Sequence, residues 1–484
     1  MSIIGQLIKD IDQQGNIGPE RFELVPTEPV EPPVDPVEPT PVPPIYVGPA
    51  PTNPIYVSAE GSDSNDGREP GTAVATHSAA KRIAWEMVRA DASKVPSFLF
   101  RDDDEFEPFG DMMATDGQHW DRRDLQGHPD EPVIFGRYGN GKRPVFNGGG
   151  FQSSGNKGGC ANIELRGLRV NGGSLLSLKS TREGCKIVDC VGRDATVTVK
   201  APESGGRFDG FEMVNTIISD VVRPGTHHHL GLYLWGVDGW SVRGSNFYRV
   251  GWNGSGPDAP DSELQQNVRA HCVYVSGTCS PGDIDNTILA FSGGGNQYRT
   301  GGKFTRNAVL WSARPGLTFG ITQGGFSGDN AWSGEVTGSL FAGNGHGEGS
   351  GKIALDMGDV DGVGITGNTF QEAIRFNALA GPNDRGGQWN GVNRTVVTRN
   401  KIAADIHLQN DGWGYLGGDG LRVHDNDWDG QYKEVSYSDL RGAVDRGWND
   451  SGPLALPIIS HTAELASEIR NGLSAADLIE RFAA

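Results

Sequence analysis

A short arrangement of hydrophobic and polar positions recurs through the second half of the chain. In VVTRNKI a hydrophobic residue, Val397, is followed three positions later by Asn400 and two positions after that by Ile402. Further copies, some with Ser or Thr in place of Asn, are Phe304-Asn307-Val309, Ile365-Asn368-Phe370, Val423-Asn426-Trp428, Val242-Ser245-Phe247, Val336-Ser339-Phe341 and Met213-Thr216-Ile218. From Phe304 onward the first positions lie 26 to 32 residues apart. A period of about 30 residues with variable length predicts a solenoid whose insertions lie in loops.

The interior of one copy indicates strands. In GLYLWGVDGWSV, Leu232 and Leu234 alternate with Tyr233 and Trp235, which is the periodicity of a strand and excludes a helical repeat. Asn tolerates left-handed backbone geometry better than other residues except Gly, and its side chain can bond to a neighbour one coil away. The pattern therefore predicts a parallel β-helix with stacked Asn residues at the bends.

The segments around the repeats predict four regions. Residues 1–24 carry a short amphipathic pattern, and twelve prolines in residues 25–54 predict a polyproline-like spacer, which is either a stalk or an ordinary linker. Residues 55–450 are expected to form the β-helix, with THSAAKRIAWEMVRA as a helix that caps its N-terminal end. Residues 451–484 predict two short helices that close the solenoid or join subunits.

Two stretches before the repeats connect the chain to a known superfamily. IYVSAEGSDSNDG, residues 55 to 67, resembles the N-terminal entry to the β-helix of pectate-lyase-like proteins, and PVIFGRYGNGKRPVFNGGG is similar to the stretch that leads into the regular coils. The resemblance covers roughly residues 55–450 and implies an all-β, right-handed parallel β-helix. It implies no particular activity, because function depends on the site that a fold carries.

Composition and charge exclude several kinds of partner. The formal net charge of −19 repels phosphates, so neither nucleic acid nor an anionic membrane surface is expected as a general partner. No apolar run is long enough to cross a bilayer, so membrane insertion is not expected, and no export signal is visible. The five cysteines are an odd number without zinc-like spacing, which favours reduced thiols in a protein made in the cytosol.

The outward strand positions supply candidate binding residues. Aligning GLYLWGVDGWSV with ALDMGDVDGVGI places Tyr233 level with Asp356, and HCVYVSG supplies Tyr274 at the same position. With Thr318 in a single coil between Tyr274 and Asp356, these side chains are expected to form a column at about 4.8 Å per coil. Aromatic faces stack on sugar rings, so the column is a candidate floor for a glycan; the alternative is ordinary half-exposed strand residues. The candidate substrate-binding residues are Tyr233, Trp235, Tyr274 and Trp252.

Carboxylates near this column are candidates for acid–base chemistry. Hydrolysis of a glycan needs two carboxylates roughly 5 to 10 Å apart. A lyase instead needs a base and a group that neutralises the substrate carboxylate. The candidate catalytic residues are Asp356, Asp359 and Glu335, with Asp329, Asp258, Asp261 and Glu263 as further acids. None forms a motif that names a mechanism, and each is alternatively a turn cap or a solvated loop charge.

No metal site is assigned from the sequence. Of the adjacent histidines His227, His228 and His229, only the first and third share a side of a strand, and a third ligand would have to come from another coil. His271 has the parity of inward residues and is expected to be packed. Calcium is common among pectate-lyase-like enzymes, and the Asp-rich segments 62–66 and 356–361 leave it open as a cofactor.

Three classes of function remain. An amphipathic start, a Pro-rich spacer and a β-helix in this order resemble a bacteriophage tailspike. The resemblance implies a virion-tail protein made in the host cytoplasm, whose N-terminus docks to a tail or baseplate protein. Its β-helix then binds, with or without depolymerising, a host surface polysaccharide. The alternatives are an extracellular bacterial polysaccharide lyase or glycoside hydrolase, and a structural tail fibre without a glycan site. Apolar surfaces at both ends of the chain favour a homotrimer.

Overall fold

The structure is a computed structural model that describes residues 49–112, 114–115, 118–119, 126–153, 161–179, 183–201, 206–225, 228–320, 332–347, 351–377, 380–382, 388–390, 392–404, 406–409, 421–427, 432–435 and 463–483. The expected docking segment 1–24 and the first part of the expected spacer, residues 25–48, lie outside the described residues. His227, Asp329 and Trp428 also lie outside them.

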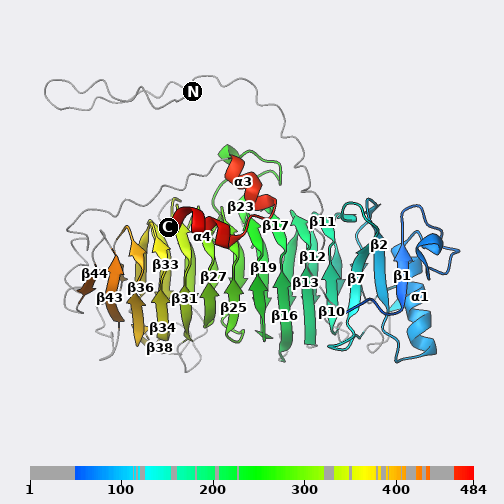
Figure 1. Ribbon diagram of the computed structural model, residues 1–484, viewed down its shortest axis with the longest axis horizontal. Helices are drawn as coiled ribbons and strands as arrows, with labels where there is room; N and C mark the ends of the chain where they lie inside the picture. Colours follow the sequence, from blue (N-terminus) through cyan, green and yellow to red (C-terminus); the bar gives the residue numbers. More distant parts are fainter. Residues whose placement is uncertain are drawn as a thin grey trace, which may run out of the picture. The chain divides into compact units, whose positions relative to one another are not determined.

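The described part is a parallel β-helix, as the repeat predicted, and it is right-handed, as the resemblance implied (Figure 1). Successive coils contribute strands to three ladders, two in one sheet and the third in another. The first ladder contains β1 (Pro54–Val57), β2 (Ser97–Arg101), β7 (Val133–Tyr138), β10 (Ile163–Arg166), β13 (Glu183–Val188), β16 (Phe208–Val214), β20 (Val237–Asp238), β21 (Ser241–Arg243), β25 (Gly282–Asp285), β28 (Gly302–Thr305), β31 (Trp332–Thr337), β34 (Val360–Thr366), β39 (Val392–Asn393), β40 (Thr395–Thr398) and β43 (Leu421–Asp427). The second contains β3 (Glu105–Phe106), β8 (Val145–Asn147), β11 (Arg169–Asn171), β14 (Val191–Arg193), β17 (Ile217–Ser219), β22 (Asn246–Tyr248), β26 (Ile288–Ala290), β29 (Ala308–Leu310), β32 (Leu340–Ala342), β35 (Thr369–Phe370) and β41 (Lys401–Ile402).

The third ladder forms the other sheet. It contains β4 (Gly110–Asp111), β9 (Phe151–Ser153), β12 (Ser174–Lys179), β15 (Thr196–Lys200), β19 (Leu230–Trp235), β24 (His271–Val275), β27 (Gln297–Tyr298), β30 (Leu317–Gly320), β33 (Ile353–Gly358), β36 (Ala373–Asn377) and β42 (Ile406–Gln409). Short pairs outside the ladders are β5 (Ala114–Thr115) with β6 (Gln118–His119), β18 (Val222–Arg223) with β23 (Trp252–Asn253), and β37 (Ala380–Pro382) with β38 (Gln388–Asn390). β44 (Tyr432–Val435) pairs antiparallel with β43.

The first hydrophobic positions of the repeat stack in one interior row of the first ladder. Val242 on β21 is in register with Met213 on β16, and Val336 with Ile365 one coil further on. The row continues through Val397 to Val423, and its members are buried. The structure adds a coil that the sequence pattern missed, Ile284-Thr287-Leu289, which lies between the copies that begin at Val242 and Phe304.

The Asn positions form the expected ladder of hydrogen bonds. The backbone N–H of Asn368 donates to Oδ1 of Asn400 at 2.9 Å, and the N–H of Asn400 donates to Oδ1 of Asn426 at 3.0 Å. The left-handed residue, however, is the one before the ladder position: Arg399 has φ +57° and Asp425 has φ +53°. The expectation that the Asn itself is left-handed is therefore wrong, because the preceding residue makes the turn and leaves the Asn free to bridge coils.

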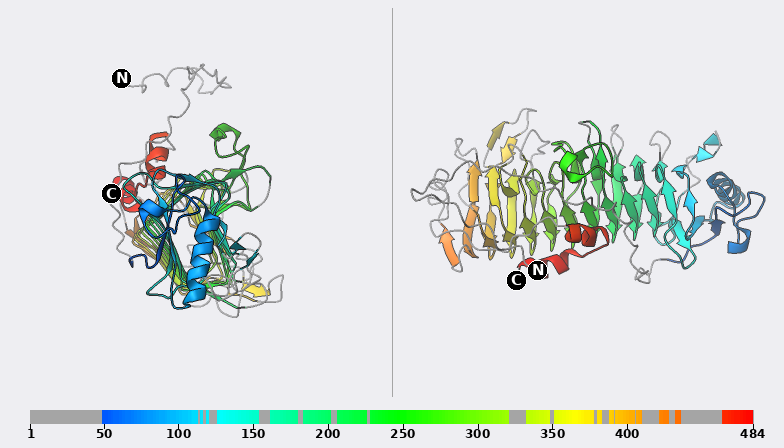
Figure 2. Two further views of the ribbon diagram at one scale, coloured as in Figure 1. Left: turned by 90° about the vertical axis from the view of Figure 1, so that its right-hand side faces the viewer. Right: turned by 90° about the horizontal axis from the view of Figure 1, so that it is seen from above.

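Helix α1 (His77–Ala90) covers the N-terminal end of the coils, as predicted (Figure 2, left). Thr76 caps it by accepting a hydrogen bond from the N–H of Ala79, and its apolar face packs against β1. Lys81 is buried on this face, where its Nζ donates to the carbonyl oxygens of Phe109 and Asp111 at 2.9 and 2.8 Å. The open edge of the first coil is thereby closed.

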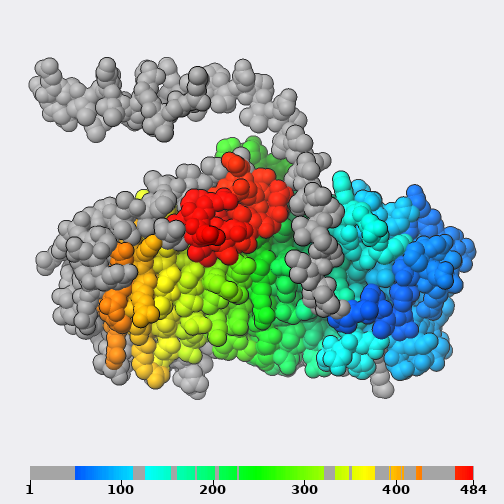
Figure 3. Space-filling model, viewed as in Figure 1, coloured from blue at the N-terminus to red at the C-terminus, as the bar shows by residue number. Residues whose placement is uncertain are grey.

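The C-terminal helices lie on the flank of the solenoid and not over its last described coil (Figure 3). Helices α3 (Ala463–Arg470) and α4 (Ala475–Ala483) pack onto outward apolar residues of the second ladder. Asn246 on β22 donates from Nδ2 to the carbonyls of Ile469 and Leu473, both at 2.9 Å. Of the two alternatives expected for this pair, closing the solenoid or joining subunits, the first does not hold, because its apolar face meets a matching apolar stripe on the outside of the coils. Within the described residues, no helix is long and apolar enough to cross a membrane.

Candidate functional site

The predicted column lies in register on the outer side of the third ladder. Tyr233 pairs with Tyr274, and Thr318 pairs with Asp356. Between Tyr274 and Thr318 lies one more coil, represented by Gln297, so two coils separate Tyr274 from Asp356 and not one. The extra coil was missed because β27 is only two residues long and follows a run of three glycines, which leaves no alternation to recognise.

Aromatic rings from neighbouring coils meet on this side of the sheet. Tyr233 and Tyr274 are both half-buried and pack edge to face, with ring centroids 5.5 Å apart. Trp235 lies two residues beyond Tyr233 on β19, with ring centroids 6.4 Å apart. Cations approach both ends of this aromatic group: Nζ of Lys200 is 5.5 Å from the Trp235 ring, and Cζ of Arg299 is 5.2 Å from the Tyr274 ring. We call Lys200, Tyr233, Trp235, Tyr274 and Arg299 the third-ladder face.

The third ladder is poor in acids although the chain has a net charge of −19. Across the described strands from β12 to β36, the acid is Asp356, and it is paired with Arg375. The same stretch, with the residue that follows β27, carries four cations: Lys179, Lys200, Arg299 and Arg375. On these strands basic side chains outnumber the single acidic one, which favours an anionic ligand at this face.

Asp356 does not stand ready as an acid or a base. It is 4% exposed, and its two carboxylate oxygens accept hydrogen bonds from Nε and Nη2 of Arg375 at 2.9 and 2.7 Å. The same contact raises the pKa of the Arg375 guanidinium. Asp356 and Arg375 are in register on β33 and β36, so the pair joins neighbouring coils. This arrangement assigns Asp356 to holding two coils together.

The three predicted catalytic carboxylates do not share a surface. Asp359 is 1% exposed and occupies a left-handed corner, with φ +54°, between β33 and β34. Glu335 lies on β31 of the first ladder, in the other sheet, where Oε1 is 3.8 Å from Nζ of Lys303. Because Glu335 and Asp356 lie on different sheets, the structure does not assemble the acid pair that the sequence suggested.

Trp252 is not part of the third-ladder face. It is 5% exposed, its Nε1 donates to the carbonyl of Phe291 at 2.6 Å, and the two rings are 4.7 Å apart. It belongs to the apolar cluster between the second ladder and the C-terminal helices, so the prediction that it contacts sugar is wrong. Acids of the insertion around it are also engaged: Asp258 pairs with Arg193, and Asp261 accepts from Nε of Arg249 at 2.8 Å beside η3 (Asp261–Glu263).

His271 and acids of the two Asp-rich segments are engaged in packing, hydrogen bonds or ion pairs within the fold. His271 is buried, as expected; burial lowers its pKa to about 3, and Nδ1 lies 3.1 Å from the carbonyl oxygen of Gly294. Asp63 accepts hydrogen bonds from the backbone and side chain of Thr76 at the start of α1, and Asp361 pairs with Arg394. Within the described residues, no three His, Cys, Asp or Glu side chains are grouped to hold a metal ion.

Glu372 is a buried acid that no motif in the sequence marks. It directly precedes β36, where its Oε1 accepts from the N–H of Gly343 at 2.5 Å and its Oε2 from Nδ2 of Asn344 at 3.2 Å. Burial raises its pKa from the ordinary 4.5 to about 7. The sequence holds no local signal for this, since the two partners lie on the preceding coil.

Glu372→Gln is expected to flatten the pH dependence of stability. Because the folded state raises this pKa from 4.5 to about 7, the folded state binds the proton more tightly than the unfolded state. The stability that protonated Glu372 gives the folded state is fully present below pH 4.5. It is lost as the pH rises to about 7, by about 3 kcal/mol in total. Urea unfolding at several pH values across this window measures the slope. The exposed Glu480→Gln is the control and should keep the parent slope; an unchanged slope in Glu372→Gln contradicts the prediction.

Comparisons with known proteins give a fold likeness only. No protein-family model matches the chain, and no curated protein matches its sequence. Among solved structures, pectate lyase Pel9A is 12% identical, with a TM-score of 0.33 over 81% of this chain and 83% of that one. A rhamnogalacturonan lyase is 13% identical, with a TM-score of 0.33 over 87% and 99% of the two chains. The GH136 lacto-N-biosidase from Eubacterium ramulus is 12% identical, with a TM-score of 0.30 over 78% and 67%. The β-helix assignment for this chain rests on its own parallel ladders.

Proposed function

We propose that this chain is a tailspike-like receptor-binding protein whose third-ladder face binds an acidic surface polysaccharide. The observation that supports this most directly is the pairing of aromatic rings with cations on a sheet poor in acids. Tyr233 and Tyr274 offer half-exposed rings from adjacent coils, and Lys200 and Arg299 stand at the two ends of the group. Rings stack on the apolar faces of sugars, and the cations select polymers that carry carboxylates or other anions.

The tailspike part of the proposal rests on the order of the segments. An amphipathic segment, 1–24, and a Pro-rich spacer, 25–54, precede the β-helix, which suits a protein that docks to a virion tail and projects a binding domain. We retain the homotrimer as part of this proposal. Its support is the N-terminal segment alone, since α3 and α4 bury their apolar face within their own chain.

We propose polysaccharide binding as the function of this face, and cleavage of the polysaccharide is tested separately. Asp356 is occupied by Arg375, and Glu335 lies on another sheet, so the third-ladder face offers recognition groups and no assembled acid pair among the candidates named above. Gel filtration of a host polysaccharide after incubation with the protein separates the two. Loss of chain length would show cleavage, and a new absorbance from an unsaturated uronate would show a lyase.

Tyr233→Ala and Tyr274→Ala are expected to weaken polysaccharide binding by up to a few kcal/mol, the range for loss of one well-packed aromatic contact. Stability should change by about 1 kcal/mol or less, because these side chains are half-exposed. Biolayer interferometry with immobilised capsular polysaccharide from candidate hosts measures the affinity. The matched control is Tyr56→Ala, which removes one ring of the edge-to-face pair Tyr56–Tyr138 on the first ladder, 5.0 Å between centroids, and should bind as the parent does.

The charge requirement has its own readout. The same polysaccharide with its carboxyl groups reduced to alcohols should bind more weakly than the native polymer, and the difference should shrink at high salt. Lys200→Gln should reduce the difference in affinity between the native and the carboxyl-reduced polymer, whereas Lys303→Gln on the first ladder should leave that difference unchanged. Equal binding of the native and the reduced polymer to the parent protein would rule out the acidic class. Unchanged binding in both tyrosine variants would rule out the third-ladder face.

A further inference from the structure

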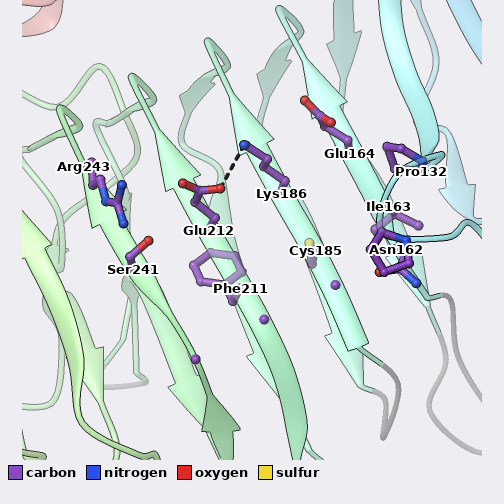
Figure 4. A pocket seen from close by; sticks show the side chains of 14 residues that line it. Pro132, Asn162, Ile163, Glu164, Cys185, Lys186, Phe211, Glu212, Ser241 and Arg243 are labelled. Atoms are coloured by element: carbon purple, nitrogen blue, oxygen red, sulfur yellow. Dashed lines mark ion pairs between the residues drawn. The ribbon is translucent and has the colours of Figure 1, made fainter. Parts of the chain in front are cut away.

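A groove crosses the outer side of the first ladder, away from the third-ladder face. It spans β10, β13, β16 and β21 and has a volume of about 480 Å³ (Figure 4). That volume lies within the range of about 300 to 1,000 Å³ that is typical of ligand sites. The groove runs across the strands, so a chain lying in it passes from coil to coil along the solenoid.

Glycines in a left-handed conformation form the floor of the groove. Gly184, Gly210 and Gly239 occupy equivalent places on successive coils, with φ of +74°, +79° and +58°. A Cβ atom at Gly239 would lie 2.9 Å from Oδ1 of Asp209, and a side chain at any of the three would be strained by its backbone conformation. Side-chain oxygens of Asn162 and Asp209 lie against Gly184 and Gly239, whereas the neighbours of Gly210 are backbone atoms of Gly184, so a ligand can approach the backbone closely at Gly210.

Charged and polar side chains form one wall, one for each coil. Glu164, Lys186, Glu212 and Ser241 are in register on successive strands, and Figure 4 shows them on the same side of the sheet, with Arg243 beyond. Nζ of Lys186 is 2.9 Å from Oε2 of Glu212. Glu164 accepts from Nε and Nη2 of Arg166 at 2.6 and 2.9 Å.

We infer that this groove is a second carbohydrate site, specific for a neutral oligosaccharide. With Arg166, which holds Glu164, and Asp209, which lies against Gly239, the carboxylates and cations in and beside the lining are equal in number, so the groove has no net charge that favours a charged polymer, in contrast to the third-ladder face. Glu164 is 2% exposed and held by Arg166, so the groups open to a ligand are the acceptor oxygens of Glu212 and the donors of Lys186, Ser241 and Arg243. A sugar hydroxyl both donates and accepts, so it can use each of these groups on the coils of β13, β16 and β21. Pro132 supplies apolar surface at one end.

The test is a printed array of neutral and acidic oligosaccharides probed with the full chain and its variants. The inference expects neutral oligosaccharides among those bound. Ser241→Trp, which fills the groove, should abolish their binding, and Arg243→Ala should weaken it about tenfold, the effect of losing one or two hydrogen bonds to a charged group. Lys303→Ala, on the same ladder but outside the groove lining, is the control. Circular dichroism establishes that each variant is folded.

Tyr233→Ala separates this inference from the proposed function. It should weaken acidic ligands and leave the neutral ones bound. Three results would overturn the inference: no neutral oligosaccharide bound by the parent, neutral binding that survives both Ser241→Trp and Arg243→Ala, or neutral binding lost equally in Tyr233→Ala. The last result would place neutral sugars on the third-ladder face.

Discussion

Val242→Asp is expected to prevent folding. Val242 is fully buried on β21, in the interior row between Met213 and Ile284 on the neighbouring coils. An ionised carboxylate at this place has no partner inside the solenoid, and the cost of burying it reaches or exceeds the roughly 5 to 15 kcal/mol by which a domain is stable. Soluble yield, far-ultraviolet circular dichroism and resistance to limited proteolysis measure the outcome.

Ser241→Asp is the matched control for this substitution. It adds the same carboxylate one residue earlier on the same strand, where the side chain points outward into the groove. Because successive side chains of a strand point to opposite faces, this variant should fold and resist protease like the parent. A folded, protease-resistant Val242→Asp would contradict the placement of the whole interior row.

The interior of the solenoid could be predicted because the sequence of each coil contains the pattern that places its own inward residues. Each copy of the repeat carries its own inward hydrophobic residues and its own ladder residue, so aligning copies aligned the coils. Val336 and Ile365, 29 residues apart in sequence, are in register in the structure. The missed copy, Ile284-Thr287-Leu289, obeys the same rule with Thr at the ladder position, and accepting it would have inserted the missing coil.

The outer surfaces could be predicted only in part, because what covers an outward residue depends on distant sequence. The alignment of turns predicted that Tyr233, Tyr274 and Asp356 occupy equivalent positions on their coils. It could not predict the partner of Asp356, because Arg375 belongs to the next coil. Trp252 was misplaced for a similar reason. The helices that complete its apolar cluster begin more than 200 residues later, at Ala463.

The sequence does contain one signal that the C-terminal helices cover the second ladder. Outward strand positions of a β-helix are normally polar, yet the second ladder carries outward Ile288, Ala308 and Leu340 in register on successive coils. An apolar outward row of this length predicts a cover, and the amphipathic helices near the C-terminus are the segments of matching character. Reading the two together would have placed α3 and α4 on the flank.

Arg375→Ala is expected to destabilise the fold by about 3 to 5 kcal/mol, the cost of breaking a buried ion pair by removing one partner. Asp356 is nearly buried, and the bidentate contact from Arg375 is lost as a whole. The carboxylate then loses its guanidinium partner in a poorly solvated place. Urea unfolding measures the change.

The double variant Asp356→Asn, Arg375→Ala should recover most of that loss, because a neutral amide costs far less to bury than a carboxylate that has lost its guanidinium. Asp356→Asn alone should cost less than Arg375→Ala alone. If Asp356 instead served as an acid or base, Asp356→Asn would remove a cleavage activity while Arg375→Ala would alter its pH profile. Equal destabilisation by Arg375→Ala and the double variant would mean that the two side chains are not coupled. The join between β33 and β36 would then rest on backbone hydrogen bonds and interior packing alone.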